Sequence, residues 1–473
     1  MRPLKGMRDL DEAEMLRLRR AGEAVERCLC SYGYRMVEPP ILEPVELFLR
    51  KSGGELAARM YTFRDPGGNR VSLRPELTAP VIRMFIDKRG AEALPLRWQY
   101  RGPVFRYEAD EPDNLRQFTQ VGAELIGVEG PRADAEVLAV AALSAKALGV
   151  APVTLVVGHV GVLRGFLEQF GLSERAKLFL LSSIGELKRG QGGVEQVRAR
   201  GRELALLGPR SEEPYGEYGR GGLLGGGANH FGGLLSSQGQ PLGSRTWEEI
   251  EARLRRKLEG RDEPGSVEKA LAFMSEVAKI EGAPQDAVGR ARKLAGEQGL
   301  DHAPLRALEE VLDTFALHEV GGARVVVDLG LARGLAYYTG MVFEVKHQAL
   351  KGGASLGGGG RYDGLVKALG YGEDVPALGF ALGLERAIQF GGPPKGKEVR
   401  EIRHLLVVPR TSKAYGAALK TARALRLAGE GAQVVPEPLE GDRGMSYAQR
   451  SGCDAIVIVD ERGDSERVPV LRK

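Results

Sequence analysis

The chain has 473 residues, 43% of them hydrophobic and 27% charged, a size that one hydrophobic core rarely organises, so we expect a globular protein of two or three domains. The formal net charge of +4 is too small to indicate a general nucleic-acid-binding surface, so any such contact must come from a local patch. Three cysteines without metal spacing, six scattered histidines and the lack of any long apolar run exclude a disulfide framework, a structural metal and a membrane span, and we expect a cytoplasmic protein.

The first part of the chain alternates helices with short strands. Apolar residues at helical spacing predict a helix over 11–32, which Gly33 ends. A second helix is predicted over 133–148, followed by a strand that begins at Val153. Between the helices, alternating apolar and polar residues predict antiparallel strands with one covered face, in the segments 71–73, 98–100, 103–107 and 117–126.

The amino-acid composition changes in the middle of the chain. Residues 216–244 hold many glycines and few large apolar groups, so they cannot bury enough surface to offset their ordering entropy, and we expect a flexible loop. A phosphate-binding role is disfavoured because no strand precedes these glycines and no Gly-Lys-Ser or Gly-Lys-Thr follows them. Residues 246–318 are charged and rich in Leu and Ala, and they are predicted to form an inserted helical domain.

Strand patterns return in the last third. Two strands are predicted at 323–329 and 341–345, and the Gly/Pro-rich composition of 391–397 indicates a linker. Beyond the linker, the pattern predicts a small β-α-β-α-β module, with strands near 404–409, 432–435 and 455–459 and helices near 411–428 and 443–451.

Nine short motifs run through the chain in a fixed order. They are Gly6-Met-Arg-Asp-Leu, Gly33-Tyr-Arg-Met-Val-Glu-Pro-Pro-Ile-Leu-Glu, Tyr61-Thr-Phe-Arg-Asp-Pro-Gly-Gly, Leu73-Arg-Pro-Glu-Leu-Thr, Phe105-Arg-Tyr-Glu, Arg116-Gln-Phe-Thr-Gln-Val-Gly-Ala-Glu, Arg333-Gly-Leu-Ala-Tyr-Tyr-Thr-Gly, Gly358-Gly-Gly-Arg-Tyr-Asp-Gly-Leu and Gly379-Phe-Ala-Leu-Gly-Leu-Glu-Arg. A single match of this kind would be weak. The whole series, in this order and spacing, resembles the class II histidyl-tRNA synthetase family.

The resemblance implies the architecture. It predicts an α+β fold with a class II synthetase-like antiparallel sheet flanked by helices, a helical insertion and a small C-terminal α/β domain. The core would comprise residues 1–196 and 322–392, and the glycine-rich loop and helical insertion would occupy 197–321. A truncated anticodon-binding-like α/β domain would occupy 402–473. The motif that contains Pro40 resembles the one that forms the dimer in class II enzymes, so the resemblance also implies a homodimer.

The resemblance further implies a pocket for L-histidine. An amino-acid ligand needs an acceptor for its ammonium, a cation for its carboxylate and polar partners for its imidazole. The residues at the matching positions are Glu76, Gln120 and Glu124 for the ammonium and imidazole, Arg106 for the carboxylate, Arg333 for the carboxylate or a phosphate, and Tyr338 and Tyr362 for the imidazole walls. Each also has a purely structural alternative: Glu76 could cap a turn, and the tyrosines could only pack a core.

One loop departs from the family pattern. Active synthetases carry an arginine or histidine against the ATP γ-phosphate at a position that is Asn114 here. The same loop holds Glu108, Asp110, Glu111 and Asp113, of which only the first is usual for the family. Each additional carboxylate would repel a phosphate by about 1 kcal/mol or more, and loss of a charge-assisted contact costs roughly 1.5–3 kcal/mol. The alternative is that the acidic loop is merely solvated.

Two further departures point the same way. The run Val156-Val-Gly-His-Val-Gly-Val-Leu-Arg-Gly-Phe-Leu is similar to the synthetase-like regulatory subunit of ATP phosphoribosyltransferase. In the C-terminal module, Gly444-Met-Ser-Tyr-Ala-Gln replaces an expected Lys-Lys-Gln helix, and the chain stops after Leu471-Arg-Lys, before an expected final strand and helix. Lost lysines weaken contacts to RNA phosphates. Against this interpretation, the regulatory family often lacks a C-terminal module, which this chain keeps.

The sequence therefore favours a non-catalytic, histidine-binding regulatory subunit. It would assemble with an ATP phosphoribosyltransferase catalytic subunit and would need no cofactor, and tRNA would be a disfavoured partner. Histidine would shift the complex toward a less active state. The alternative is a histidine–tRNA ligase that uses ATP and Mg, in which Arg106, Arg333 and Arg386 stabilise the attack of the histidine carboxylate on the α-phosphate. A stand-alone histidine sensor is a third hypothesis, without a distinguishing sequence feature.

Overall fold

The computed structural model describes residues 3–50, 58–88, 94–108, 115–204, 206–207, 262–331, 338–350, 354–391, 403–439 and 442–470. The chain forms two compact units, one of Met1–Leu163 with Val277–Lys473 and the other of Arg164–Glu276. The glycine-rich loop expected at 216–244 and nearly all of the linker expected at 391–397 lie outside the described residues.

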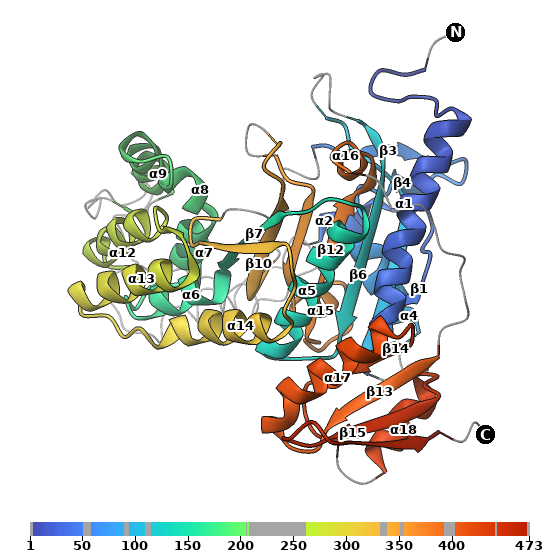
Figure 1. Ribbon diagram of the computed structural model, residues 1–473. Helices are drawn as coiled ribbons and strands as arrows, with labels where there is room; N and C mark the ends of the chain where they lie inside the picture. Colours follow the sequence, from blue (N-terminus) through green and yellow to red (C-terminus); the bar gives the residue numbers. More distant parts are fainter. Residues whose placement is uncertain are drawn as a thin grey trace, which may run out of the picture. The chain divides into compact units, whose positions relative to one another are not determined.

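A nine-stranded sheet organises the larger unit (Figure 1). Its order is β1-β5-β6-β12-β11-β10-β7-β9-β8, and every neighbouring pair is antiparallel except β1 with β5 and β7 with β9. The strands are β1 (Arg35–Met36), β5 (Leu96–Phe105), β6 (Gln117–Ile126), β7 (Val153–His159), β8 (Glu281–Gly282), β9 (Ala323–Asp328), β10 (Met341–Lys346), β11 (Gly357–Arg361) and β12 (Ala377–Gly383). The accompanying helices are α1 (Glu12–Ser31), α2 (Val45–Leu49), α4 (Thr78–Asp87), α5 (Pro131–Ala147), α13 (Pro284–Glu297), the 3-10 turn η1 (Ala303–Leu305), α14 (Arg306–Leu317), α15 (Leu365–Ala368) and α16 (Leu384–Ile388).

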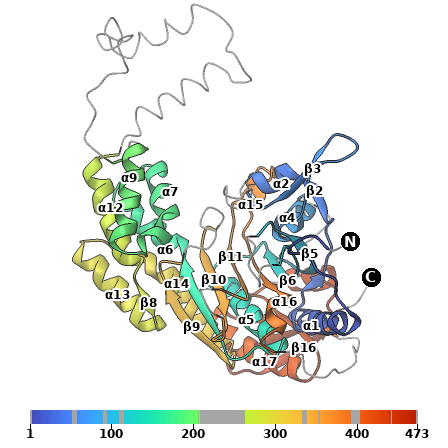
Figure 2. The same ribbon diagram turned by 90° about the horizontal axis from the view of Figure 1, so that it is seen from above.

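Strand β5 distributes its side chains to both faces of this sheet, because successive Cβ atoms in a strand point to opposite sides. Trp98 and Tyr100 join an apolar cluster with α4 and α15. Arg97 and Gln99 point the other way, where their side chains bond to Glu136 on α5 and to the Tyr34 carbonyl after α1. Figure 2 shows α4 and α15 on one side of β5 and β6 and α1 on the other.

The N-terminal helix α1 begins and ends close to the predicted positions. The Asp11 carboxylate accepts a hydrogen bond from the Glu14 N–H at 2.8 Å, which satisfies a donor that the first turn leaves open. Gly33 adopts φ +84° directly after the helix, a conformation that favours glycine and turns the chain toward β1. The helix predicted at 133–148 and the strands predicted at 117–126, 323–329 and 341–345 are confirmed as α5, β6, β9 and β10. The segments 98–100 and 103–107 form one continuous strand, β5, rather than two.

A small three-stranded sheet lies beside α2, with order β2-β4-β3. Its strands are β2 (Leu42–Pro44), β3 (Tyr61–Arg64) and β4 (Arg70–Leu73). This sheet and the chain segments next to it carry large apolar side chains that are 41–48% exposed, which we call the N-terminal apolar patch: Met36, Ile41, Leu42, Leu49 and Phe63. Large apolar side chains that stay exposed are candidates for an interface.

The smaller unit, Arg164–Glu276, is helical in its described part. Its helices are the second half of α6 (Val160–Glu168), α7 (Glu174–Ser182), α8 (Ile184–Leu187), α9 (Gln191–Glu203) and α12 (Pro264–Val277). Phe273 on α12 packs edge-on against Phe166 with ring centroids 5.3 Å apart, and Arg198 on α9 pairs with Glu268 at 3.1 Å. The predicted boundaries at 197 and 321 remain a proposal.

A four-stranded sheet of order β14-β13-β15-β16 forms the C-terminal α/β domain. Its elements are β13 (His404–Pro409), the 3-10 turn η2 (Ser412–Ala414), α17 (Tyr415–Leu427), β14 (Gly431–Val434), α18 (Arg443–Arg450), β15 (Ala455–Val459) and β16 (Ser465–Pro469). The predicted β-α-β-α-β order is present. The sequence did not predict β16, because Ser465-Glu-Arg-Val-Pro is an exposed, charged edge strand without the apolar alternation that marks a covered one.

A buried polar network attaches this domain to the core. Arg97 on β5 pairs with Glu136 on α5 at 2.9 Å, and its Nη2 also donates to the Val434 carbonyl of β14 at 3.1 Å. The guanidinium of Arg426 on α17 lies 3.4 Å from the ring centroid of Tyr32, which follows α1. Since Arg97, Glu136 and Tyr32 are buried, the two parts of the unit meet through specific hydrogen bonds as well as apolar contact. Among the described residues, every helix is too short or too polar to cross a membrane.

Candidate functional site

The structure brings most of the predicted site residues to one face of the nine-stranded sheet. Glu124 and Gln120 lie on β6, Tyr362 directly follows β11, and Glu76 precedes α4. Arg333 lies outside the described residues. Arg106 directly follows β5, and Tyr338 lies before β10, where its ring faces Gly360 on β11.

Glu124 is the centre of the site. Its side chain is fully buried, and it accepts hydrogen bonds from Thr78 Oγ1 at 2.7 Å, Tyr100 OH at 2.9 Å and Tyr362 OH. Burial raises the pKa of Glu124 to about 7, although these three donors act in the opposite direction. Three hydroxyl groups from three separate elements thus hold one carboxylate that ionises near neutral pH.

Glycines make the space that this carboxylate occupies. Gly379 on β12 stands opposite Glu124 in the strand register. A Cβ at Gly379 would lie 1.6 Å from Glu124 Oε2 and 2.4 Å from the Ala123 carbonyl oxygen. A Cβ at Gly360 on β11 would similarly lie 2.8 Å from the ring of Tyr338. These two motif glycines are therefore required by close approach and not by backbone conformation.

Glu76 is fixed by the first turn of α4. Its carboxylate accepts hydrogen bonds from the N–H groups of Thr78 at 2.5 Å and Ala79 at 3.0 Å. Burial raises the pKa of Glu76, while these backbone donors and the nearby Arg106 lower it. The structural alternative expected for Glu76, capping of a turn, is therefore present; a role in ligand binding is compatible with it and stays a proposal.

Gln120 carries an acceptor without a protein partner. Its side chain is 7% exposed, and its Oε1 is buried without any hydrogen-bond partner among the described residues. Buried polar atoms are nearly always satisfied in native proteins, so an orphaned acceptor beside a carboxylate points to a ligand with N–H donors. The preceding residue, Thr119, is held by the Glu385 carboxylate, which accepts from its N–H and its hydroxyl group at 2.8 Å each.

The cationic side of the site is less enclosed. Arg106 Nε donates to the Pro75 carbonyl at 2.8 Å, and its guanidinium lies 5.4 Å from the centroid of the Phe118 ring. Arg386 on α16 is exposed and donates to the Ser355 carbonyl at 3.0 Å. Arg106 thus links the segment that carries Glu76 to an aromatic ring, and both arginines could meet an anionic group.

Sequence reasoning missed several residues that build this site. Thr78 stands inside the Leu73-Arg-Pro-Glu-Leu-Thr motif, and Tyr100 shares a face of β5 with buried Trp98, so motif membership and strand alternation were the available signals. Arg361 was also missed; it pairs with Asp134 at 2.9 Å and donates to the Val128 carbonyl at 3.0 Å, which positions the adjacent Tyr362.

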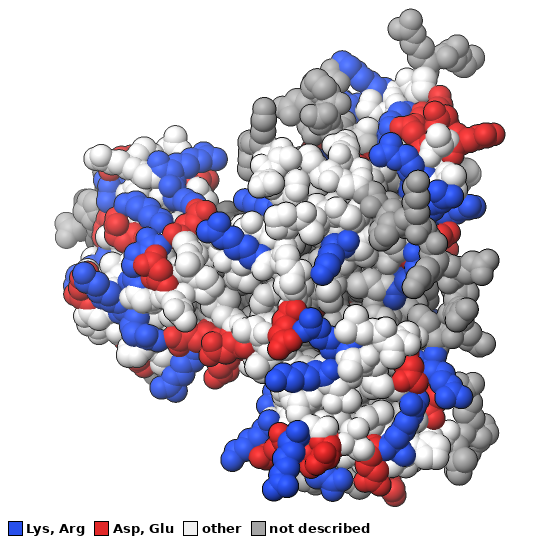
Figure 3. All heavy atoms as spheres, viewed as in Figure 1, with Lys and Arg blue, Asp and Glu red and all other residues white. Residues whose placement is uncertain are grey.

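Most of the acidic loop is outside the described residues, including Asp110, Glu111, Asp113 and Asn114. Its first carboxylate, Glu108, pairs with Arg59 at 3.3 Å. On the face drawn in Figure 3, basic and acidic side chains are interspersed over the C-terminal domain. This face therefore shows no continuous positively charged surface there.

Comparison with known proteins identifies the family to which the chain is similar. A family model described as histidyl-tRNA synthetase matches residues 6–189 and 242–387. Curated histidine–tRNA ligases are similar over nearly the whole chain: that of Methanocaldococcus jannaschii is 28% identical over 97% of this chain and 91% of its own length, that of Pyrococcus furiosus 29% over 98% and 92%, and that of Halobacterium salinarum 30% over 97% and 90%.

Solved structures are similar in fold. Histidyl-tRNA synthetase from Nostoc matches with a TM-score of 0.55 and 20% identity over 99% of this chain and 96% of its own. A Bacillus halodurans protein described as an ATP phosphoribosyltransferase regulatory subunit/histidyl-tRNA synthetase also matches with a TM-score of 0.55, at 22% identity over 97% and 98%. The predicted α+β architecture, with an antiparallel-rich sheet, helices and a small C-terminal α/β domain, is confirmed.

Proposed function

This chain belongs to the histidyl-tRNA synthetase family, and from that premise we propose that it is a histidine–tRNA ligase. The observation that carries the proposal is the similarity to curated ligases over 97–98% of the chain, which extends through the C-terminal α/β domain as well as the core. This reverses the preference for a regulatory subunit, which was drawn from the acidic loop together with the run that begins at Val156 and the changed C-terminal module.

The proposed pocket binds L-histidine through the groups around Glu124. The imidazole donates to Gln120 Oε1, whose acceptor has no partner among the described residues, and approaches the Glu124 carboxylate. The ammonium group approaches Glu76, whose carboxylate is already oriented by the first turn of α4. The histidine carboxylate faces Arg106, with Tyr338 and Tyr362 as walls; Arg333 would complete the cationic side.

The second substrate is ATP with Mg. Arg106 and Arg386 supply cations for its phosphates, and the Phe118 ring beneath Arg106 offers a face for stacking. The protein's task is to align the histidine carboxylate with the α-phosphate and to stabilise the charge that develops there, together with Arg333. The loop with Asn114 lacks a cation that active family members place against the γ-phosphate, so we expect slower activation than they achieve.

Histidine-dependent ATP–pyrophosphate exchange on the purified full chain tests this proposal. We expect exchange that requires histidine, followed by charging of histidine tRNA. An Arg386→Gln variant should lose at least about tenfold in exchange, since one charge-assisted contact is worth roughly 1.5–3 kcal/mol. If the protein binds histidine but shows no exchange above the level without histidine, the ligase proposal is wrong.

A second candidate is favoured by the acidic loop: a histidine-binding regulatory subunit of ATP phosphoribosyltransferase, with no catalytic residue of its own. The stretch Glu108–Asn114 would disfavour the ATP tail and RNA. Co-purification with an ATP phosphoribosyltransferase catalytic subunit, and histidine inhibition only in the complex, would support this candidate. A catalytic subunit that is fully active and histidine-inhibited alone would exclude it.

The pKa of Glu124 predicts a pH dependence of histidine binding. The proposed contact needs the carboxylate, and a group with a pKa of about 7 is mostly ionised at pH 8 and mostly protonated at pH 6. Affinity is therefore present above pH 7 and lost as the pH falls through 7, by about tenfold between pH 8 and pH 6. Calorimetric titration at several pH values measures it. Glu124→Gln is the control, because it leaves only the titration of free histidine; an identical slope in both proteins contradicts the prediction.

The N-terminal apolar patch predicts a homodimer. Ile41 and Phe63 are 42% and 48% exposed. A second copy of the chain is the partner implied by the motif that contains Pro40, which resembles the dimer-forming motif of class II enzymes. We expect Ile41→Asp with Phe63→Asp to convert a dimer into a monomer at micromolar concentration, because each new carboxylate would be buried unpaired at the interface. Light scattering after gel filtration measures the mass. Leu427→Asp, at a site 82% exposed on α17, is the control; a dimer that survives the double change excludes this surface.

A further inference from the structure

A second pocket lies where the C-terminal domain meets the core, away from the site around Glu124. Its volume is about 570 Å³, within the range of small-molecule sites, which often occur at domain boundaries. Its walls are largely apolar, with Leu94, Pro95 and Val128 from the core and Val435, Leu439 and Tyr447 from the C-terminal domain.

Hydrogen bonds across the boundary hold these walls together. Tyr447 OH donates to the Pro95 carbonyl at 3.2 Å, and Arg97 Nη2 donates to the Val434 carbonyl at 3.1 Å. Arg132 pairs with Glu437 at 2.7 Å on another side. The pocket is thus built from parts that are already fixed, so a ligand would spend little of its binding free energy on ordering them.

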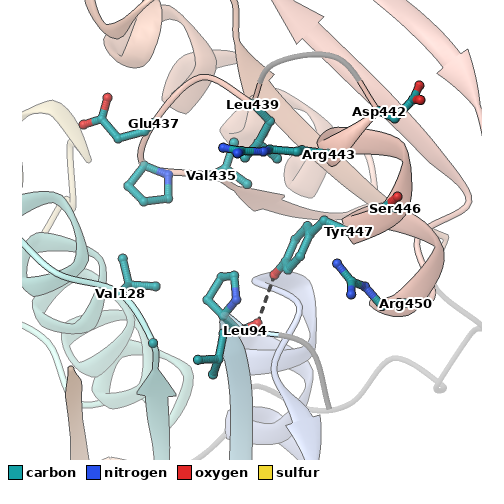
Figure 4. A pocket seen from close by; sticks show the side chains of 13 residues that line it. Leu94, Val128, Val435, Glu437, Leu439, Asp442, Arg443, Ser446, Tyr447 and Arg450 are labelled. Carbon is teal, nitrogen blue, oxygen red and sulfur yellow. Dashed lines mark hydrogen bonds between the residues drawn. The ribbon is translucent and has the colours of Figure 1, made fainter. Parts of the chain in front are cut away.

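One face of α18 gives the pocket its charge. The pocket is lined by Arg443, Ser446, Tyr447 and Arg450. These residues share one face of the helix because they are three, four and seven positions apart. Figure 4 shows Arg443 extending toward Val435 and Leu439 and Arg450 on the other side of the Tyr447 ring, whereas the carboxylate of Asp442 points away. Neither arginine has an acidic partner among the residues that the structure describes, and Glu437 is already engaged by Arg132 and by the Ser412 hydroxyl at 2.8 Å.

We propose that this pocket binds a small organic anion. An apolar or aromatic body would lie against Val128, Val435 and Leu439, and a phosphate or carboxylate group would meet Arg443, with Arg450 adding positive charge on the other side of Tyr447. Arginine suits both groups because its planar guanidinium pairs with two oxygens at once. The apolar walls disfavour a ligand that is only a charged head, and the two arginines disfavour a cationic one.

The pocket adjoins two strands that also carry residues of the site around Glu124. Leu94 and Pro95 directly precede β5, and Val128 follows β6. These strands carry Tyr100 and Glu124. Binding at this pocket does not depend on the proposed ligase activity, so the two proposals can fail separately.

Phenyl phosphate and benzoate are suitable probes, with inorganic phosphate as the probe that lacks an apolar body. Titration of the full chain is followed by calorimetry or by NMR of the ligand. At least one organic anion should bind saturably below about 10 mM. Inorganic phosphate should bind at least about tenfold more weakly, which corresponds to about 1.4 kcal/mol. Whichever of the two anions binds more tightly identifies the head group.

Variants test the assigned residues. Arg443→Gln with Arg450→Gln should weaken the better probe at least about tenfold, while Arg462→Gln, an exposed arginine elsewhere on the same domain, should leave it unchanged. Ser446→Trp should fill the pocket and abolish binding without lowering the melting temperature, because Ser446 is exposed. The proposal is overturned if neither organic anion saturates, or if the double arginine variant binds as tightly as the unmodified protein.

Discussion

Replacing Gly379 with alanine is expected to destroy the proposed histidine site. The new methyl group would lie 1.6 Å from Glu124 Oε2 and 2.4 Å from the Ala123 carbonyl oxygen, and neither can move freely within paired strands. Overpacking of this kind costs roughly 1–3 kcal/mol of folding free energy. Displacement of Glu124 should raise the dissociation constant for histidine by at least about 100-fold, since loss of contacts worth about 3 kcal/mol has that effect. Urea denaturation and calorimetric titration measure the two quantities.

Gly416→Ala is the matched control. Gly416 lies in α17, where an added Cβ meets nothing within 4 Å, so alanine should be neutral or stabilise the helix by up to about 1 kcal/mol. Histidine affinity should not change. If Gly379→Ala resembles this control in both measurements, the close approach of β12 to Glu124 does not limit the site.

Replacing Arg97 with alanine is expected to give the largest loss of stability. Arg97 and Glu136 form a buried pair at 2.9 Å, with side chains only 2% and 9% exposed. Removal of one partner leaves the other charge buried, which costs about 3–5 kcal/mol. The same change removes the hydrogen bond to the Val434 carbonyl, so hydrogen exchange in β14 and α18 should accelerate as the C-terminal domain loosens from the core.

Arg410→Ala separates this effect from the loss of a surface charge. Arg410 and Glu466 form a 3.5 Å pair whose side chains are 60% and 65% exposed, and such pairs contribute about 0–1 kcal/mol. A second variant, Arg97→Met with Glu136→Leu, should recover much of the lost stability, because no charge remains buried. If Arg97→Ala and Arg410→Ala unfold at the same urea concentration, the buried network does not anchor the domain.

Long periodic segments were predicted well because their signals are local. The helices at 11–32 and 133–148 have apolar stripes or continuous burial, and strand 117–126 combines apolar residues with a partial alternation, so each is indicated by its own residues. Strand β16 was missed for the converse reason. It forms because its backbone pairs with that of β15. The residues Ser465–Pro469 contain no pattern that predicts this pairing.

The candidate site divides in the same way. The motifs identified Glu124, Gln120 and Tyr362 as residues of interest, but their spacing carries no information about which hydroxyl groups surround a carboxylate. Thr78, Tyr100 and Tyr362 are separated by many residues in sequence and meet at Glu124 only because β6 pairs with β5 and β12. The buried environment that raises the pKa of Glu124 is likewise a property of the assembled sheet.

The sequence alone determined the family resemblance, the fold class and the order of elements. Motif residues and hydrophobic periodicity are local signals, so they can be recognised without knowing the tertiary contacts. It weighed the acidic loop more heavily than the full-length similarity later warranted. Tertiary structure decided the convergence on Glu124, the buried Arg97–Glu136 anchor and the pocket beside α18. Each of these depends on segments distant in the chain that only strand pairing and helix packing bring together, and burial then sets their energies by removing water from around the charges.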